Sequence, residues 1–312
     1  MTSAPAPIKT KLRIGDLVFS RSAVFAGSMI LVTLAAVAIF LIVQSIPAVV
    51  ATTEDASILK TNFWDYVGPL VFGTVWAAAL ALLVALPISI GIALFISHYA
   101  PRRLASVLGY VVDLLAAVPS VVFGLWGIGV FAPALVDAYA WLNEYLGWIP
   151  LFSGTPSATG RTILTAALVL AVMVLPIMTA ICREVFLQTP VLHEEAALAL
   201  GATRWEMIRT AVLPFGRSGI ISASVLGLGR ALGETMAVAM VLSASPVITF
   251  QLLTSVNPNT IAANIALSFP EAYGLNVNVL IATGLILFVV TFAVNAFARW
   301  IVSRRKEFSG AN

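Results

Sequence analysis

The chain has 312 residues, of which 60% are hydrophobic and 10% are charged, and its mean hydropathy is +1.02. Soluble domains are roughly 45 to 50% apolar and about 25% charged, so this composition excludes a soluble globular protein. The net charge of +3 is scattered over an apolar chain and does not indicate nucleic-acid binding. One cysteine and two histidines exclude a disulfide framework and form no zinc-binding pattern.

Six apolar runs are long enough for helices across a bilayer, which need roughly 20 residues each. They predict an all-α integral membrane protein with six transmembrane helices. The predicted helices cover residues 23–46, 69–97, 107–136, 162–181, 218–245 and 277–298. The first run has no internal proline and predicts a peripheral helix, whereas the inner runs contain prolines whose freed carbonyls need neighbours in a packed bundle.

Basic residues predict how the helices are oriented. With the N-terminus in the cytoplasm, fourteen of the seventeen lysines and arginines fall inside, Lys60 and Arg161 fall outside, and Arg230 lies within the fifth run. This bias predicts that both termini are cytoplasmic. Residues 140–149, which mix tryptophan and tyrosine with polar residues, predict an interfacial helix on the outer side.

The longest segment on the predicted cytoplasmic side covers residues 183–217. Helix-forming residues lead to Gly201, a predicted helix stop, and a second short helix is predicted from Thr203. Two short helices around a glycine form a compact projection. Such a projection can dock into a groove of a cytoplasmic protein and transmit its motion to the adjacent spans.

This segment resembles the EAA loop of ABC-importer permeases, although the family usually has isoleucine where Ala211 stands. The matching residues are Glu195, Ala196 and Ala197, then Gly201, and then Ala211, Val212, Leu213 and Pro214. The resemblance implies that the loop contacts a separate ATPase subunit. The chain has no G-x-x-x-x-G-K-[ST] motif of its own, so we expect a transport subunit that is not itself an enzyme.

Two charges lie inside the fifth predicted span. Arg230 follows Ser218 by twelve residues, which places it about 18 Å deep, near the midplane of the bilayer. An arginine there costs roughly 2.5 to 3.5 kcal/mol, so it should face protein or water. Glu234 follows at i+4, where it can pair with Arg230 on one helix face. The two residues form either a structural ion pair or a site for a passing oxyanion.

Glu234 favours phosphate as that oxyanion. A carboxylate can accept a hydrogen bond from a protonated phosphate oxygen, which sulfate lacks at neutral pH. We therefore expect a phosphate path through Arg230 and Glu234. Sulfate and molybdate remain the alternative substrates.

Four stretches resemble the phosphate-specific ABC transporter permeases, namely LLAAVPSVVFGLWG, VLPIMTAICREVF, GLGRALGETMAVAMV and TIAANIA. The match is closest to the PstC type of subunit, with the paralogous PstA type as the near alternative. The resemblance implies phosphate-path roles for Arg230 and Glu234. It also implies a type I ABC importer permease fold over residues 69–303. In chain order, a cytoplasmic tail at 1–22, the first helix and an extracytoplasmic loop at 47–68 come before this fold, and a cytoplasmic tail at 304–312 follows it.

The same resemblance implies the partners of the chain. These are a PstA-like permease, a dimer of PstB-like ATPase subunits and a PstS-like extracytoplasmic phosphate-binding protein in the cytoplasmic membrane. ATP would be bound by the ATPase, and no cofactor or metal is expected in this chain.

Two other functions remain as alternatives, an ion-gradient secondary transporter and a scaffold that signals phosphate status. The first is disfavoured because few ionisable groups lie in the membrane for a proton relay. Three further polar residues have weaker assignments. His98 is predicted to be solvated, Asp113 to be interfacial or capping, and Asn264 to face the path or to pack between helices.

Overall fold

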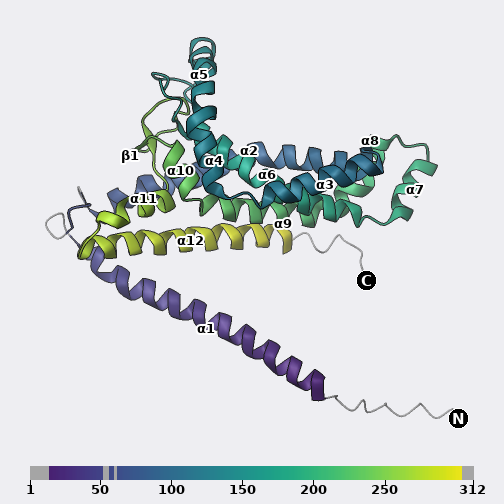
Figure 1. Cartoon of the computed structure of the whole chain (residues 1–312), viewed down its shortest axis with the longest axis horizontal. Helices are drawn as coiled ribbons and strands as arrows, with labels where there is room; N and C mark the ends of the chain where they lie inside the picture. Colours follow the sequence, from purple (N-terminus) through teal and green to yellow (C-terminus); the bar gives the residue numbers. More distant parts are fainter. Residues whose placement is uncertain (1–13, 52–55, 60–61, 304–312) are drawn as a thin grey trace.

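The computed structural model describes residues 14–51, 56–59 and 62–303, which fold almost entirely into helices (Figure 1). Six helical stretches in these ranges are long and apolar enough to cross a membrane. They are Gly15–Val50, Phe63–Tyr99, Ser120–Leu146, Ile163–Leu187, Arg204–Leu232 and Leu275–Trp300. The prediction of a mostly helical protein with six long apolar helices is therefore confirmed. Most of the two predicted tails lies outside the described residues.

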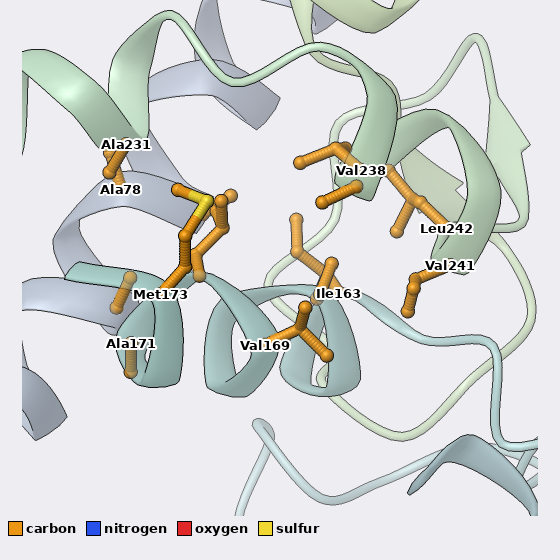
Figure 2. Close-up of a cluster of buried hydrophobic side chains, with 14 of the residues drawn as sticks. Ala78, Ile163, Val169, Ala171, Met173, Ala231, Val238, Val241 and Leu242 are labelled. Atoms are coloured by element: carbon orange, nitrogen blue, oxygen red, sulfur yellow. The ribbon is translucent and has the colours of Figure 1, made fainter. Parts of the chain in front are cut away.

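Helix α6 (Ile163–Leu187) forms the centre of the bundle, packed against α2 (Phe63–Leu94) and α9 (Leu213–Leu232). Alanines make this packing close, because Ala77, Ala81 and Ala85 recur every four residues along α2 and are all buried. Small side chains at this spacing let helix backbones approach each other in a membrane. Figure 2 shows Ala78 of α2 and Ala231 of α9 near Met173 of α6.

Helix α1 (Ile14–Val50) lies at the periphery and splays away from the bundle (Figure 1). Only its C-terminal end packs, where Ala48 joins Phe63 and Val279 in a buried cluster. There the Asn278 side chain of α12 (Leu275–Ser303) donates hydrogen bonds to the backbone and side-chain oxygens of Gln44, at 2.8 and 2.9 Å. The rest of α1 exposes its apolar side chains, as a helix facing lipid does.

The predicted span at 107–136 is wrong as a single helix. Helix α3 (Arg102–Ala116) ends before Pro119, and a second helical stretch runs from Ser120 to Leu146. Proline lacks an N–H to donate and disfavours the helical conformation of the residue before it, which explains the break. The second stretch comprises α4 (Ser120–Trp126), the π turn η2 (Gly127–Phe131) and α5 (Ala132–Leu146).

Most of the predicted interfacial helix therefore belongs to the end of a longer one. Figure 1 shows α5 projecting away from the axis of the bundle. Its terminal Trp141 and Tyr145, and Trp148 after it, are exposed.

The segment predicted as a cytoplasmic loop is largely helical. Helix α2 ends in the π turn η1 (Phe95–Tyr99), and beyond α6 come α7 (Val191–Ala199) and α8 (Arg204–Met207). The π turn η3 (Ile208–Val212) joins α8 directly to α9, so one continuous helical stretch runs from Arg204 to Leu232.

The predicted span at 218–245 ends early, because α9 stops at Leu232 and is followed by the short α10 (Met236–Val241). A cap of loops then follows. It contains the parallel strands β1 (Ala244–Ser245) and β2 (Asn257–Pro258), helix α11 (Ile261–Ser268) and the 3-10 turn η4 (Phe269–Glu271).

Hydrogen bonds of the Asn257 side chain connect this cap to the start of α6. The side-chain oxygen of Asn257 accepts a hydrogen bond from the Ile163 N–H at 3.0 Å, and its side-chain nitrogen donates to the carbonyls of Arg161 and Ser243. The Asn257 side chain is fully buried, so these bonds satisfy polar groups that water cannot reach.

Gly73 of α2 offers a test of how closely the cap sits on the bundle. A Cβ atom at this position would overlap the carbonyl oxygen of Asn259, whereas one at Gly91, on the same helix, would meet nothing within 4 Å. We expect Gly73→Ala to destabilise the protein by about 1–3 kcal/mol through overpacking. Gly91→Ala should be neutral or gain helix propensity. Thermal unfolding midpoints in detergent measure the difference, and equal midpoints for the two variants would contradict this packing.

Candidate functional site

The two charged residues predicted within one span lie on either side of a helix end. Helix α9 stops at Leu232, and Gly233 caps it with φ −93° and ψ 0°. Glu234 lies in the turn that follows, and its side-chain oxygen Oε1 accepts a hydrogen bond from the N–H of Ala237, 3.1 Å away. Glu234 is therefore a buried carboxylate at the start of α10, where free N–H groups favour a negative charge.

The predicted pairing of Arg230 with Glu234 on one helix face is wrong. The i+4 relation holds only within a continuous helix, and α9 ends between the two residues. Within residues 14–51, 56–59 and 62–303, Arg230 makes no ion pair. Its Nε atom is buried and has no hydrogen-bond partner there. In this part of the chain, the Arg230 guanidinium is thus paired with no carboxylate, and its Nε–H donor makes no hydrogen bond.

Arg230 lines a cavity of about 1040 Å³ between α6, α9 and α12. The cavity is open to the surface, because Ser222, Leu226 and Arg299 in its lining are exposed. Most of the lining is aliphatic, and the polar groups come from α9 and α12. The lining residues are Ile177, Ile181, Ile221, Ser222, Val225, Leu226, Gly229, Arg230, Asn295 and Arg299. A mostly apolar cavity with a few convergent polar groups is the usual form of a small-molecule site.

Two of these polar residues escaped the sequence analysis. Arg299 lies one residue beyond the predicted end of the sixth span, among the charges assigned to the cytoplasm, and Asn295 drew no attention within it. The available signal was their i, i+4 spacing, which places both on one face of α12.

The loop that resembles the EAA loop forms the predicted pair of helices around a glycine. Helix α7 carries Glu195, Ala196 and Ala197, and Gly201 ends it with φ +86°, in the left-handed region that favours glycine. Thr203 then caps α8 through a capping box with Glu206. The predicted stop at Gly201 and the predicted start at Thr203 are both confirmed.

The exposed side of this loop carries large apolar residues among charged ones such as Glu195 and Arg204. Val191, Leu192, Leu198, Leu200 and Trp205 are all exposed, and Leu200 reaches 90% of its full accessibility. On the inner side Ala197 packs against a buried cluster that includes Phe186 and Met207. The loop is therefore anchored on one side and presents exposed apolar residues, interspersed with charged ones, on the other.

The three polar residues with weaker assignments all make side-chain contacts. His98 is buried rather than solvated, and its Nε2 atom lies 3.4 Å from a carboxylate oxygen of Glu194 on α7. Asp113 lies 3.7 Å from Arg183, which ties α3 to α6. Asn264 donates to the hydroxyl of Tyr66 at 2.6 Å, consistent with the helix-packing role left open for it.

Comparison with known sequences gives matches over most of the chain. Residues 85–307 match the family described as "Binding-protein-dependent transport system inner membrane component". The chain is 48% identical over 302 residues to the phosphate transport system permease protein PstC 2 of Mycobacterium tuberculosis, covering 93% of this chain and 92% of the relative. It is 39% identical over 313 residues to PstC of Mesorhizobium japonicum, covering 96% and 94%.

Comparison with solved structures supports the fold. A bacterial ABC transporter involved in the import of the acidic polysaccharide alginate superposes with a TM-score of 0.56 and 18% sequence identity, covering 76% of this chain and 79% of the other. The arrangement of helices is thus shared with an ABC importer.

Gly201 provides a test of the loop geometry. Alanine in the left-handed region costs about 1–2 kcal/mol, while asparagine tolerates that region better. We expect Gly201→Ala to raise local opening of α7 about 5- to 30-fold and Gly201→Asn to raise it less. Hydrogen exchange of the amides in residues 191–212 measures this opening. Equal exchange in wild type and Gly201→Ala would show that the turn does not hold the loop.

Proposed function

This chain belongs to the family of binding-protein-dependent transport system inner membrane components, and within it to the phosphate transport system permease proteins PstC, and we propose that it carries inorganic phosphate inward by alternating access. It is a multi-pass permease subunit of an ABC importer, and the ATPase is a separate subunit. The observation that carries the proposal is Arg230, an intramembrane arginine that faces a cavity without an ion-pair partner in the described part of the chain.

Arg230 is suited to bind an oxyanion in passing. Its guanidinium can donate two parallel hydrogen bonds, a geometry that matches phosphate oxygens. Because no described carboxylate neutralises it, the charge attracts an anion without having to break an existing pair. An arginine within a membrane span is costly without compensation, and a transient anion lowers that cost.

Glu234 is the second residue of the proposed phosphate path. It does not line the cavity beside Arg230, so its proposed contribution to selectivity lies at the turn after α9, before the anion reaches the cavity. Its hydrogen bond to the N–H of Ala237 fixes the carboxylate in the turn after α9. A fixed carboxylate repels a fully deprotonated anion and accepts a hydrogen bond from a protonated phosphate oxygen. Sulfate, which has no such proton at neutral pH, is disfavoured.

The apolar surface of the coupling loop is the proposed docking site for a PstB-like ATPase dimer. A cytoplasmic loop follows from the bias of basic residues, which also places both termini in the cytoplasm. The exposed Leu200 and Trp205 are the kind of anchors that fill a groove in a partner. Motion of the ATPase would then reach Arg230 through the continuous helical stretch from Arg204.

The remaining partners follow from the family. We assign a type I importer arrangement in which a PstA-like permease completes the path. A PstS-like binding protein delivers phosphate at the opposite face, where the loop cap and the end of α5 present exposed Trp148 and Tyr273.

Labelled-phosphate uptake in cells that lack this chain tests the role of Arg230. We expect wild type to restore uptake at limiting phosphate and Arg230→Gln to lower it about tenfold or more, since a charge-assisted hydrogen bond contributes about 1.5–3 kcal/mol. Phosphate should compete for uptake, and sulfate and molybdate should not.

The control is Arg21→Gln, which removes the same charge from an exposed position on α1. Both variants should reach wild-type membrane levels. Normal uptake by Arg230→Gln would show that the arginine has only a structural role. If wild type restored uptake of sulfate and not of phosphate, the substrate would be sulfate.

The coupling loop gives a second prediction. Leu200→Gln removes an exposed apolar anchor from the loop, so the ATPase should dissociate during purification while the permease remains at its normal membrane level. Leu267→Gln changes an exposed leucine of α11, distant from the loop, and should retain the ATPase. Co-purification of the ATPase with each variant is the measurement. Full retention by Leu200→Gln would refute docking at this surface.

A further inference from the structure

The cavity next to Arg230 extends along α9. Its α9 lining runs from Ile221 and Ser222 to Gly229 and Arg230, and successive members recur at helical spacing on one face. Arg230 follows Ser222 by eight residues, which corresponds to about 12 Å along the helix. The cavity is therefore long enough to hold an anion at two separate levels.

Helix α12 supplies the polar groups on the opposite wall. Asn295 and Arg299 are four residues apart and both line the cavity. Helix α12 runs antiparallel to α9 (Figure 1). Because Arg299 is near the C-terminal end of α12 and Arg230 near the C-terminal end of α9, the two arginines lie toward opposite ends of the cavity. Arg299 is on the side of the coupling loop.

The lining has two positive charges and no negative one. None of its ten residues is aspartate or glutamate, and Arg299, like Arg230, makes no ion pair among the described residues. The side-chain oxygen of Asn295 is buried and has no hydrogen-bond partner in that same part of the chain. A buried acceptor without a donor costs about 1–3 kcal/mol, so a ligand that brings a donor is favoured there.

We propose that Asn295, Arg299 and Ser222 form a second anion-binding station, which receives phosphate from Arg230 before its release at the coupling-loop side. This inference rests on the proposed function and assigns the path beyond Arg230. Arg299 binds the charge of the anion, and the oxygen of Asn295 accepts a hydrogen bond from a protonated phosphate oxygen. The uncharged acceptor selects against sulfate without repelling the phosphate anion.

Uptake by the assembled transporter in proteoliposomes tests the station. Arg299→Gln should lower the rate of phosphate import about tenfold, and Arg299→Lys should restore part of it. Asn295→Leu is the sharper variant. Removing an unpartnered buried acceptor is neutral or stabilising for folding, so a loss of about threefold or more with unchanged thermal stability would identify a ligand-binding role.

Thiol labelling reports occupancy separately from transport. The single native cysteine, Cys182, is buried, so Ser222→Cys can be labelled with a water-soluble thiol reagent. Phosphate should slow labelling of Ser222→Cys, and sulfate should not. Ser218→Cys, one turn away on α9 and outside the cavity lining, should show no protection.

The outcomes separate this inference from the proposed function. If Arg230→Gln abolishes phosphate import while Arg299→Gln and Asn295→Leu transport normally, or if phosphate fails to protect Ser222→Cys, the second station is wrong and the function stands. If wild type imports no phosphate, both fall.

Discussion

An arginine among apolar helices must be compensated, because a charge near the centre of a bilayer costs several kcal/mol. In this protein the end of α9 at Leu232 determines how that compensation is made. By ending the helix before Glu234, the chain uses this carboxylate to cap α10 and leaves Arg230 facing a cavity. An internal ion pair would have satisfied the arginine permanently. A cavity leaves it able to bind and release an anion.

The same helix connects the site to the loop formed by α7 and α8. Helix α8, the π turn η3 and α9 continue without interruption from Arg204 to Leu232, so a displacement of the loop reaches the residue next to the cavity. The loop is held to the bundle by Ala197 and Met207, which pack in a buried cluster, and by Glu194, which lies beside His98 of η1. In the proposed function these contacts would let the loop pass a movement on to α2 and α9.

Hydropathy and local turn signals predicted much of this structure. The six spans follow from apolar runs, and Gly201 and Thr203 marked a helix end and start because glycine and capping residues act locally. The break at Pro119 was missed because the prediction places the prolines of the apolar runs within continuous spans, whereas this proline ends a helix. The end of α9 was missed because the apolar run continues past Gly233. The pairing of Arg230 with Glu234 failed for that reason. Asn295 and Arg299 could not be linked to Arg230, since their proximity depends on how α12 packs against α9.

A double-mutant cycle on Arg230 and Glu234 tests the central claim, that these residues are not an ion pair. Thermal stability of the assembled transporter would be measured for wild type, Arg230→Gln, Glu234→Gln and the double variant. The structure predicts additive effects, with a coupling energy below about 0.5 kcal/mol. A coupling of about 1–3 kcal/mol would show that the two charges stabilise each other and that Arg230 is not free to bind the anion.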